Sequence, residues 1–252
     1  MIELIEVKKQ FNERFVTDGV TLKFPEKSLT AIIGRSGEGK SVLLKQIMGL
    51  IQPTSGQIMV DDIDITQVAP EQLPAIYSKF GYVFQFAALL DSLTIFENIG
   101  ITLLEQGKSE EEVLPLVLQK MELVHLPEET LWKYPQELSG GMRKKVGFAR
   151  TLLQNPQYML YDEPTSGLDP INSRVIHELM KELQTTCAMT SIVISHDIEI
   201  FNYADYVALL DRGKIRYFGP SNTIWQETNP YIYQFIRALP QGPMTIETGI
   251  RP

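Results

Sequence analysis

The sequence predicts an α/β fold with a mainly parallel sheet and an inserted α-helical subdomain. Three short apolar runs end in glycine or polar residues, as buried parallel strands do, and segments of helical periodicity lie between them. The stretch from Lys40 to Asp162 is several times longer than the roughly 30 residues that one strand-helix-strand unit needs. A large insertion must therefore separate two of the strands.

The first predicted strand covers residues 30–33, and a buried helix is expected over residues 41–50. The residues between them match the phosphate-binding pattern G-x-x-x-x-G-K-[ST] in the strand-then-helix context that the pattern requires. Glycines let successive backbone N–H groups point at phosphate oxygens, and the helix dipole adds to that field. Lys40 is expected to reach the outer phosphates, and the Ser41 hydroxyl is expected to bind Mg²⁺. The loop consists of Gly34, Arg35, Ser36, Gly37, Glu38, Gly39, Lys40 and Ser41.

Two later apolar runs, YMLYDEP and SIVISHD, end in side chains that suit the same chemistry. Ligands of open parallel sheets bind at the carboxyl ends of the strands. Asp162 can hold Mg²⁺ directly or through water, the adjacent Glu163 can polarise an attacking water, and His196 ends the other run. We therefore expect these strand ends and the phosphate loop to converge on one nucleotide. His125 and His177 are expected to be structural.

The insertion is predicted to be mainly helical. Acidic residues lead a first helix, and a second helix follows a Ser-Gly-Gly turn and stops shortly before Pro156. The apolar positions at helical spacing are Val113, Leu116, Val117, Met121 and Val124 in the first helix, and Met142, Val146, Ala149 and Leu153 in the second.

Three cations, Arg143, Lys144 and Lys145, open the second of these helices. A helix N-terminus carries partial positive charge and favours acidic residues, so these cations have the wrong sign for an isolated helix. Two interpretations remain open from the sequence. The cations either meet an anion supplied from elsewhere or form a solvated basic face.

Composition limits the classes of function. The chain has 252 residues and a net charge of −8, which argues against broad electrostatic binding of nucleic acid. No apolar run approaches the roughly 18 to 20 residues of a membrane-spanning helix, and the N-terminus lacks the layout of a signal peptide. The single cysteine, Cys187, excludes an internal disulfide framework. These features predict a protein of the reducing cytoplasm.

Nearly the whole chain resembles the ATP-binding subunits of ABC transporters. The resemblance rests on the phosphate loop, the glutamine of YVFQF, the LSGGM run at 138–142, the acidic pair of YMLYDEP, the aspartate of SGLDP and the histidine of SIVISHD, in the family's order. It implies a P-loop NTPase core of the RecA-like type, an N-terminal antiparallel β region and an inserted α-helical subdomain. The core would cover residues 1–85 and 156–220, the insertion with its signature loop 86–155, and a C-terminal helix and tail 221–252.

The resemblance also implies roles for individual residues. Phe11 would stack on adenine, with Phe15 as a rival, and Val42 would join the phosphate loop in binding ATP. The Mg²⁺ ligands would be Ser41, Gln85 and Asp162, and the catalytic residues would be Glu163, His196 and Lys40. Two identical chains would meet head to tail around two ATP molecules. Each chain would then supply, to the nucleotide held by its partner, Ser139, Gly140, Gly141, Met142 and Asp169.

Two departures from the commonest family pattern, Met142 and Gly167, narrow the resemblance. Together with FQFAALLDSLTIFENI and PYIYQFIRALPQGP, the run LSGGMRKKVGFAR is similar to the branch that serves Mce/Mla-type lipid transporters of bacterial envelopes. That likeness implies a membrane permease, an Mce-domain substrate-binding protein and transport of phospholipid or sterol. It would place the chain in the cytoplasm, peripheral on the inner membrane.

The permease's cytoplasmic helix is expected in a groove lined by Phe86, Leu89, Leu90 and residues 93–99, unless these side chains form the core of the insertion. The aromatic segment beyond Pro220 is too apolar for a free tail and is expected to pack. The residues from Pro240 onward either reach the second subunit or fray.

Two other functions are weighed against transport. An ABC-type ATPase clamp on nucleic acid or ribosomes usually carries two ATPase modules or long coiled-coil insertions, and this chain has neither, so no nucleic acid is expected. A catalytically silent regulatory subunit is disfavoured because the catalytic side chains of the motifs are present.

Overall fold

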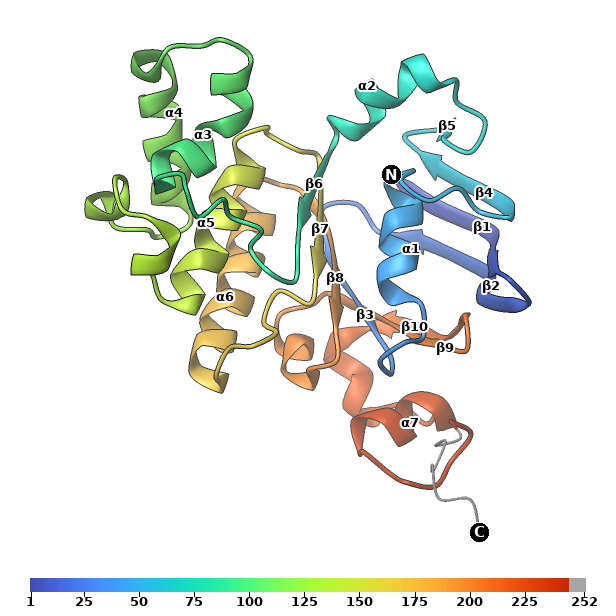
Figure 1. The fold of residues 1–252 in the computed structure, drawn as a ribbon. Coiled ribbons are helices and arrows are strands. Elements are labelled where there is room, and N and C mark those ends of the chain that lie inside the picture. The colour runs from blue at the N-terminus through green and yellow to red at the C-terminus, as the bar shows by residue number, and fades with distance from the viewer. Residues whose placement is uncertain (245–252) are drawn as a thin grey trace. The chain divides into compact units, whose positions relative to one another are not determined.

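The computed structural model describes residues 1–244, which divide into two compact units (Figure 1). The first unit comprises residues 1–25, 29–69 and the chain from 194 onward, and the second comprises residues 26–28 and 70–193. Among the described residues, no helix has both the length and the apolar character needed to cross a membrane.

An antiparallel sheet occupies the N-terminal part of the first unit (Figure 1). Its strand order is β2-β1-β4-β5, formed by β1 (Ile2–Phe11), β2 (Arg14–Phe24), β4 (Ser55–Val60) and β5 (Ile63–Asp64). Ile2 and Leu4 of β1 and Val20 and Leu22 of β2 are buried, because the period of two places alternate side chains on one face. The predicted N-terminal antiparallel region is confirmed.

The strand that precedes the phosphate loop is β3 (Leu29–Ile33), and every one of its residues is buried. It pairs in parallel with β9 (Tyr206–Asp211), as in the pair Ala31 and Val207. β9 in turn pairs antiparallel with β10 (Lys214–Pro220) across a tight turn. The phosphate loop therefore follows β3, which stands next to β9 in the order β10-β9-β3.

The helix after the phosphate loop, α1 (Lys40–Ile47), ends three residues earlier than the periodicity predicts. Gly49 adopts a left-handed φ of 76°, and the amides of Gly49 and Leu50 bond to the carbonyls of Gln46 and Lys45. A left-handed glycine that closes these bonds terminates a helix.

The second unit contains the strands that carry the acidic pair. Its strand order is β8-β7-β6, with β6 (Phe80–Val83), β7 (Tyr158–Asp162) and β8 (Thr190–Ser195), of which residues 190–193 belong to this unit. β6 and β7 pair in parallel, as predicted for the apolar runs. The short helices η1 (Pro70–Gln72) and α2 (Leu73–Tyr77) precede β6, and α6 (Pro170–Thr186) follows β7.

The segment between β6 and β7 is helical, as predicted. It contains α3 (Ile95–Glu105), α4 (Glu110–Leu123), η2 (Glu128–Thr130), η3 (Pro135–Glu137) and α5 (Gly140–Leu152) (Figure 1). Reciprocal capping boxes, Thr94 with Glu97 and Ser109 with Glu112, begin α3 and α4. Of the five apolar positions that predicted this helix, four are buried, whereas Leu116 is exposed.

The C-terminal part of the first unit contains η4 (Ile198–Asn202), η5 (Ser221–Gln226) and α7 (Pro230–Ile236). Gln234 of α7 is buried, and its side-chain amide donates to the Met244 carbonyl at 3.0 Å and accepts from the Met244 N–H at 2.8 Å. The chain therefore folds back onto α7 as far as residue 244. The rest of the predicted tail, 245–252, lies outside the described residues.

Candidate functional site

The phosphate loop connects β3 to α1 in the first unit. Gly34 and Gly39 have φ of 153° and 93°. A Cβ at Gly34 would lie 2.2 Å from the Leu210 carbonyl oxygen, and one at Gly39 would lie 2.7 Å from the Val16 carbonyl oxygen. Both glycines are required here because the neighbouring backbone leaves no space for a side chain.

Lys40, the first residue of α1, is buried within this loop. Its ammonium donates to the carbonyl oxygens of Gly34 at 2.9 Å and Arg35 at 2.8 Å. The first turn of α1 contains no acidic residue, so the helix dipole and the lysine both favour an anion at the loop. The geometry suits a phosphate group.

Glu38 has a partner that the sequence does not reveal. Its carboxylate accepts a hydrogen bond of 2.6 Å from the N–H of Arg212, in the turn between β9 and β10. The phosphate loop is thus tied to a hairpin that lies more than 170 positions further along the chain. In the pattern G-x-x-x-x-G-K-[ST], Glu38 occupies a position at which any residue is allowed. The motif therefore could not predict this hydrogen bond.

Phe11 and Phe15, the two candidates for stacking on adenine, lie at the hairpin end of β1 and β2. Their exposed fractions are 45% and 44%, so exposure does not separate them. The Lys9 ammonium lies 5.1 Å from the centre of the Phe11 ring.

Asp162 lies at the carboxyl end of β7, in the second unit, as predicted. Its carboxylate accepts a hydrogen bond of 2.7 Å from the hydroxyl of Tyr82 on β6. Burial, and then this hydrogen bond to Asp162, raise the pKa of Tyr82 far above its ordinary value, so Tyr82 remains a donor. Sequence reasoning missed Tyr82, although its position one residue before the end of an apolar strand next to β7 could have indicated it.

Glu163 follows Asp162 with a left-handed φ of 47°, which is uncommon for a residue other than glycine. Its carbonyl accepts from the Ser166 N–H at 3.0 Å, which closes a tight turn. Strained backbone of this kind is found at functional sites, where the surrounding structure holds it in place. The strain separates the two neighbouring carboxylates into different environments.

Gln85 lies in the loop after β6 and meets the same turn. Its side-chain amide donates to the Ser166 hydroxyl at 3.0 Å and approaches a Glu163 carboxylate oxygen at 3.5 Å. The second unit therefore brings together Gln85 and Glu163, which the sequence predicted, and Ser166, which it did not. A serine three positions after the acidic pair gives no signal of its own.

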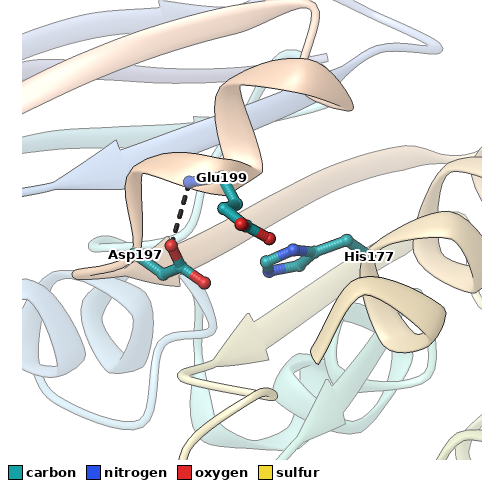
Figure 2. Close-up of side chains that lie close together, drawn as sticks. All are labelled: His177, Asp197 and Glu199. Carbon is teal, nitrogen blue, oxygen red and sulfur yellow. Dashed lines mark hydrogen bonds between the residues drawn. The ribbon is translucent and has the colours of Figure 1, made fainter. Parts of the chain in front are cut away.

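His196 directly follows β8 and is exposed. The next residue, Asp197, caps η4: its carboxylate accepts from the Glu199 N–H at 2.9 Å (Figure 2). His177, by contrast, is fully buried on α6, and the Nε2 atom of His125 forms a 2.8 Å hydrogen bond with the Glu182 carboxylate. These positions agree with structural roles for His177 and His125.

Ser139 is the N-cap of α5, and its hydroxyl accepts from the Met142 N–H at 3.3 Å. Gly140 and Gly141 lie inside the first helical turn, whereas the sequence suggested a turn ahead of the helix. A Cβ at Gly140 would lie 3.3 Å from Leu168, and one at Gly141 would lie 3.3 Å from Asn172. Space around both glycines is therefore tight.

The three cations at the start of α5 have backbone partners within the chain, which neither interpretation drawn from the sequence included. Arg143 donates to the Leu138 carbonyl, Lys144 to the Gln85 carbonyl, and Lys145 to the His125 carbonyl at 3.2 Å. Burial lowers the pKa of Lys144 and Lys145. Backbone carbonyl groups of the same chain therefore provide these cations with the partial negative charge that the N-terminus of α5 does not offer.

Asp169 is the N-cap of α6 and accepts from the N–H groups of Ile171 and Asn172, both at 3.0 Å. These hydrogen bonds, that from Asn172 first, hold the pKa of Asp169 below its ordinary value. Gly167, two residues earlier, has a φ of 78°, a conformation that a residue with a side chain would adopt with strain.

The residues predicted to hold Mg²⁺ have suitable chemistry. Ser41, Gln85 and Asp162 offer a hydroxyl, an amide and a carboxylate oxygen, and Mg²⁺ prefers such hard oxygen donors. Because Gln85 donates to the turn through its amide nitrogen, its amide oxygen is directed elsewhere. The donor set fits the ion.

The second unit contains two hollows beside the loop that carries Gln85. One, of about 450 Å³, is lined by residues that include Phe86, Leu89 and Gly140. The other, of about 390 Å³, is lined by residues that include Phe84, Ala88, Ile101 and Arg150. In the groove predicted from the sequence, Phe86 and Leu90 are exposed, but Ile95, Phe96 and Ile99 are core residues of α3, so that part of the prediction was wrong.

Comparison with known proteins identifies a family model described as "ABC transporter", which matches residues 17–166. The chain is 34% identical over 245 residues to the probable ribonucleotide transport ATP-binding protein mkl of Mycobacterium leprae, covering 96% of this chain and 70% of that protein. It is 36% identical over 258 residues to the methionine import ATP-binding protein MetN of Francisella tularensis, covering 99% and 70%. Its structure is similar to that of the dimeric ATP-binding cassette MJ0796 in a post-hydrolysis state with ADP and phosphate, with a TM-score of 0.78, 30% identity and coverage of 88% and 99%.

Proposed function

Because the chain belongs to the ABC transporter family, as an ATP-binding subunit that hydrolyses ATP, we propose that two copies close head to tail around two Mg·ATP and drive a membrane permease. The observation that carries this proposal is the pair of half-sites. One is a phosphate loop with a buried lysine, and the other is a strand end where Gln85 meets Glu163.

Within each chain, the phosphate loop binds the nucleotide. Backbone N–H groups from Gly34 to Val42 surround the phosphates, and Lys40 exchanges its two carbonyl partners for phosphate oxygens. Phe11 stacks on the adenine. Ser41, Gln85 and Asp162 hold Mg²⁺, which when bound neutralises charge on the phosphates.

Glu163 acts on the attacking water. The Asp162 carboxylate bonds to Tyr82 whereas the Glu163 carboxylate lies near the Gln85 amide, so one carboxylate serves the ion while the other orients or deprotonates water. His196 contacts the terminal phosphate. Tyr82 orients the Asp162 carboxylate through the hydrogen bond from its hydroxyl.

The second copy completes each site. Ser139, Gly140 and Gly141 present the free N–H groups of the first turn of α5 to the terminal phosphate held by the partner, and a helix N-terminus is suited to that role. Met142 and Asp169 lie beside this contact. Carbonyl groups of the same chain bind the side chains of Arg143, Lys144 and Lys145. The backbone N–H groups of α5 are therefore the main source of positive electrostatic potential at the partner's phosphate.

The permease's cytoplasmic helix docks on the second unit. We place it at the hollow that includes Phe84 and Ala88, together with the exposed Phe86 and Leu90. Leu90→Glu should abolish co-purification of the permease, whereas Leu50→Glu, at a comparably exposed leucine outside the hollow, should leave it intact. Equal recovery of the permease with both variants would refute this location.

The transported substrate is a phospholipid or related lipid of the bacterial envelope, moved by a Mce/Mla-type complex with an Mce-domain protein. The three sequence stretches LSGGMRKKVGFAR, FQFAALLDSLTIFENI and PYIYQFIRALPQGP support this branch. The names of the relatives refer to ribonucleotide and methionine transport, which supplies the competing substrates. In this proposal the chain works in the cytoplasm, attached to the inner membrane through the permease.

The test of substrate is mass spectrometry of small molecules retained by the intact complex, purified in mild detergent with its permease. Phospholipid or sterol enriched over the detergent extract of the same membranes supports the lipid assignment. Retention of methionine, or of a nucleotide other than ATP and its hydrolysis product ADP, refutes it. Recovery of nucleic acid or ribosomes without a hydrophobic permease would instead support the clamp.

A further inference from the structure

We propose that Lys144 and Arg150 of α5 are positioning residues for Gln85, and that they hold the backbone of the Gln85 loop at a fixed place on the helix. The inference rests on the role proposed above for Gln85 as a ligand of Mg²⁺. Three hydrogen bonds and one close approach of backbones carry it.

The loop between β6 and α3, residues 84–94, has no helix or strand. Its backbone therefore needs partners from elsewhere, since unpaired buried carbonyls are costly. Within the loop, the Leu93 N–H donates a backbone hydrogen bond of 3.1 Å to the Leu90 carbonyl. Side chains of the neighbouring helices supply the other partners.

The part of the loop that follows Gln85 is held by cations of α5. Lys144 donates to the carbonyl of Gln85 itself. Arg150 donates to the carbonyls of Ala87 at 2.9 Å and Ala88 at 2.7 Å. Three of the first four carbonyls from Gln85 onward thus accept from this one helix.

The backbones of α5 and the loop also approach closely. A Cβ at Gly147, between the two cations along the helix, would lie 3.5 Å from the Ala87 carbonyl oxygen. Ala88 adopts a left-handed φ of 49°, which shows that the loop is bent to meet the helix. Burial lowers the pKa of both cations because it removes water that would stabilise the charge, and the carbonyl oxygens take the place of part of that water.

The far end of the loop has a separate attachment. Asn98 of α3 is fully buried, accepts from the Leu90 N–H at 2.8 Å, and donates to the carbonyls of Leu90, Leu93 and Thr94, each at 3.0 Å. Asn98 therefore fixes residues 90–94, whereas α5 fixes residues 85–88. Of these two attachments of the loop backbone, the one to α5 includes Gln85 itself, through Lys144.

The consequence is that the helix whose N-terminus faces the partner's nucleotide also sets the position of a ligand in its own chain's site. Groups that orient a metal ligand typically change metal affinity or activity by about 10- to 100-fold when they are removed. Loss of the cation should therefore weaken the response to Mg²⁺ more than the affinity for ATP.

The experiment compares full-length Lys144→Met and Arg150→Met with the control Lys145→Met. Lys145 is a neighbouring lysine of the same helix that also caps a carbonyl, but that of His125 rather than one in the Gln85 loop. Lys144→Arg tests rescue by a retained charge. The two readouts are the Mg²⁺ concentration for half-maximal ATPase at saturating ATP, and hydrogen–deuterium exchange of residues 84–94 in the nucleotide-free chain.

We expect Lys144→Met and Arg150→Met to raise the half-maximal Mg²⁺ concentration about tenfold and to speed exchange across residues 84–94. Lys145→Met should match the wild type in both readouts, and Lys144→Arg should recover most of the Mg²⁺ response. In a Gln85→Ala background, adding Lys144→Met should produce no further change in the Mg²⁺ response, because the lysine acts through the glutamine.

The inference is overturned if Lys144→Met and Arg150→Met behave like Lys145→Met in both readouts, or if Lys144→Met shifts the Mg²⁺ response equally with and without Gln85. If Gln85→Ala alone leaves the Mg²⁺ response unchanged, the role proposed for Gln85 fails, and the exchange data then report the loop contacts separately. A variant that loses its thermal unfolding transition is replaced by Lys144→Gln, which keeps a donor without the charge.

Discussion

Glu163 is the residue on which the proposed chemistry depends most. Replacing it with glutamine removes the base but keeps the size of the side chain and its contact with Gln85. We expect Glu163→Gln to bind ATP like the wild type and to lose about 10²- to 10⁴-fold in steady-state turnover. Phosphate release and binding of a fluorescent ATP analogue measure the two quantities.

The control for this variant is Glu178→Gln. Glu178 lies on α6 in an exposed ion pair with Arg174, so the same change should leave turnover unaltered. Near-normal turnover of Glu163→Gln would contradict the assignment of the base.

Gly39 tests whether the shape of the phosphate loop depends on a single missing side chain. Gly39→Ala meets the backbone of Val16 at 2.7 Å, in addition to the strain of a positive φ. We expect it to lose ATP binding and to unfold at lower urea concentration. Isothermal titration with ATP and urea unfolding measure these effects.

Gly107→Ala is the matched control, because Gly107 has a φ of 85° and nothing lies within 4 Å of the position that a Cβ would take. It should cost only the strain of a left-handed residue, about 1 to 2 kcal/mol, and keep ATP binding. If the two variants bind ATP equally well, close packing does not shape the loop.

At the scale of secondary-structure elements, the N-cap of α6 has a predictable pH dependence. The folded pKa of Asp169 is depressed, so its contribution to stability is complete above the ordinary aspartate value of 3.8 and is lost as the pH falls through the lower folded pKa. Asp169→Ala should therefore destabilise the chain at neutral pH and progressively less at acid pH. Urea unfolding at several pH values measures this difference.

Asn229→Ala provides the comparison, since Asn229 caps α7 through an amide that does not titrate in this range. Its effect on stability should not follow the titration of an aspartate. A parallel loss of effect for both variants at low pH would show that acid acts elsewhere in the chain.

The elements differ in how well the sequence predicted them. The apolar runs that became β3, β7 and β8 could be predicted because a fully buried parallel strand needs little beyond its own hydrophobicity. The phosphate loop could be predicted because its glycines have no substitute. Helix ends were less accurate, as in α1, since a left-handed glycine stops a helix whose apolar pattern continues.

What could not be predicted depends on contacts between distant segments. The partners of Lys144, Glu38 and Asp162 are a loop carbonyl, a hairpin N–H and a tyrosine on another strand. No local pattern encodes these pairs, because the chain must first fold to bring them together. The carbonyl partners of the α5 cations were missed for the same reason.

At the scale of the whole molecule, the proposed head-to-tail dimer predicts that two inactive variants restore activity when they are mixed, which a monomeric enzyme could not do. Lys40→Ala disables the loop of a chain, and Ser139→Arg disables what that chain offers to its partner. Each variant alone should be inactive. Mixed in equal amounts, they form some dimers in which one site combines the intact loop of one chain with the intact Ser139 of the other.

If the chains mix freely and the sites act independently, about a quarter of wild-type ATPase should return, because half of the dimers then hold one intact site of two. The measurement is ATPase of the mixture against each variant alone at equal total protein. Continued inactivity after verified subunit exchange, or full activity of Ser139→Arg by itself, would contradict the shared site.

Two contacts of the phosphate loop have a consequence for folding during synthesis. Gly34 lies close to the Leu210 carbonyl, and Glu38 accepts a hydrogen bond from the Arg212 N–H. The whole GRSGEGKS sequence emerges from the ribosome long before the β9–β10 hairpin has been synthesised. Since domains complete their folding only when their parts have emerged, a nascent chain halted before Tyr206 carries the full motif without the backbone groups that shape it. Nucleotide capture should therefore begin only when the hairpin leaves the exit tunnel, so that half-made copies do not compete for ATP.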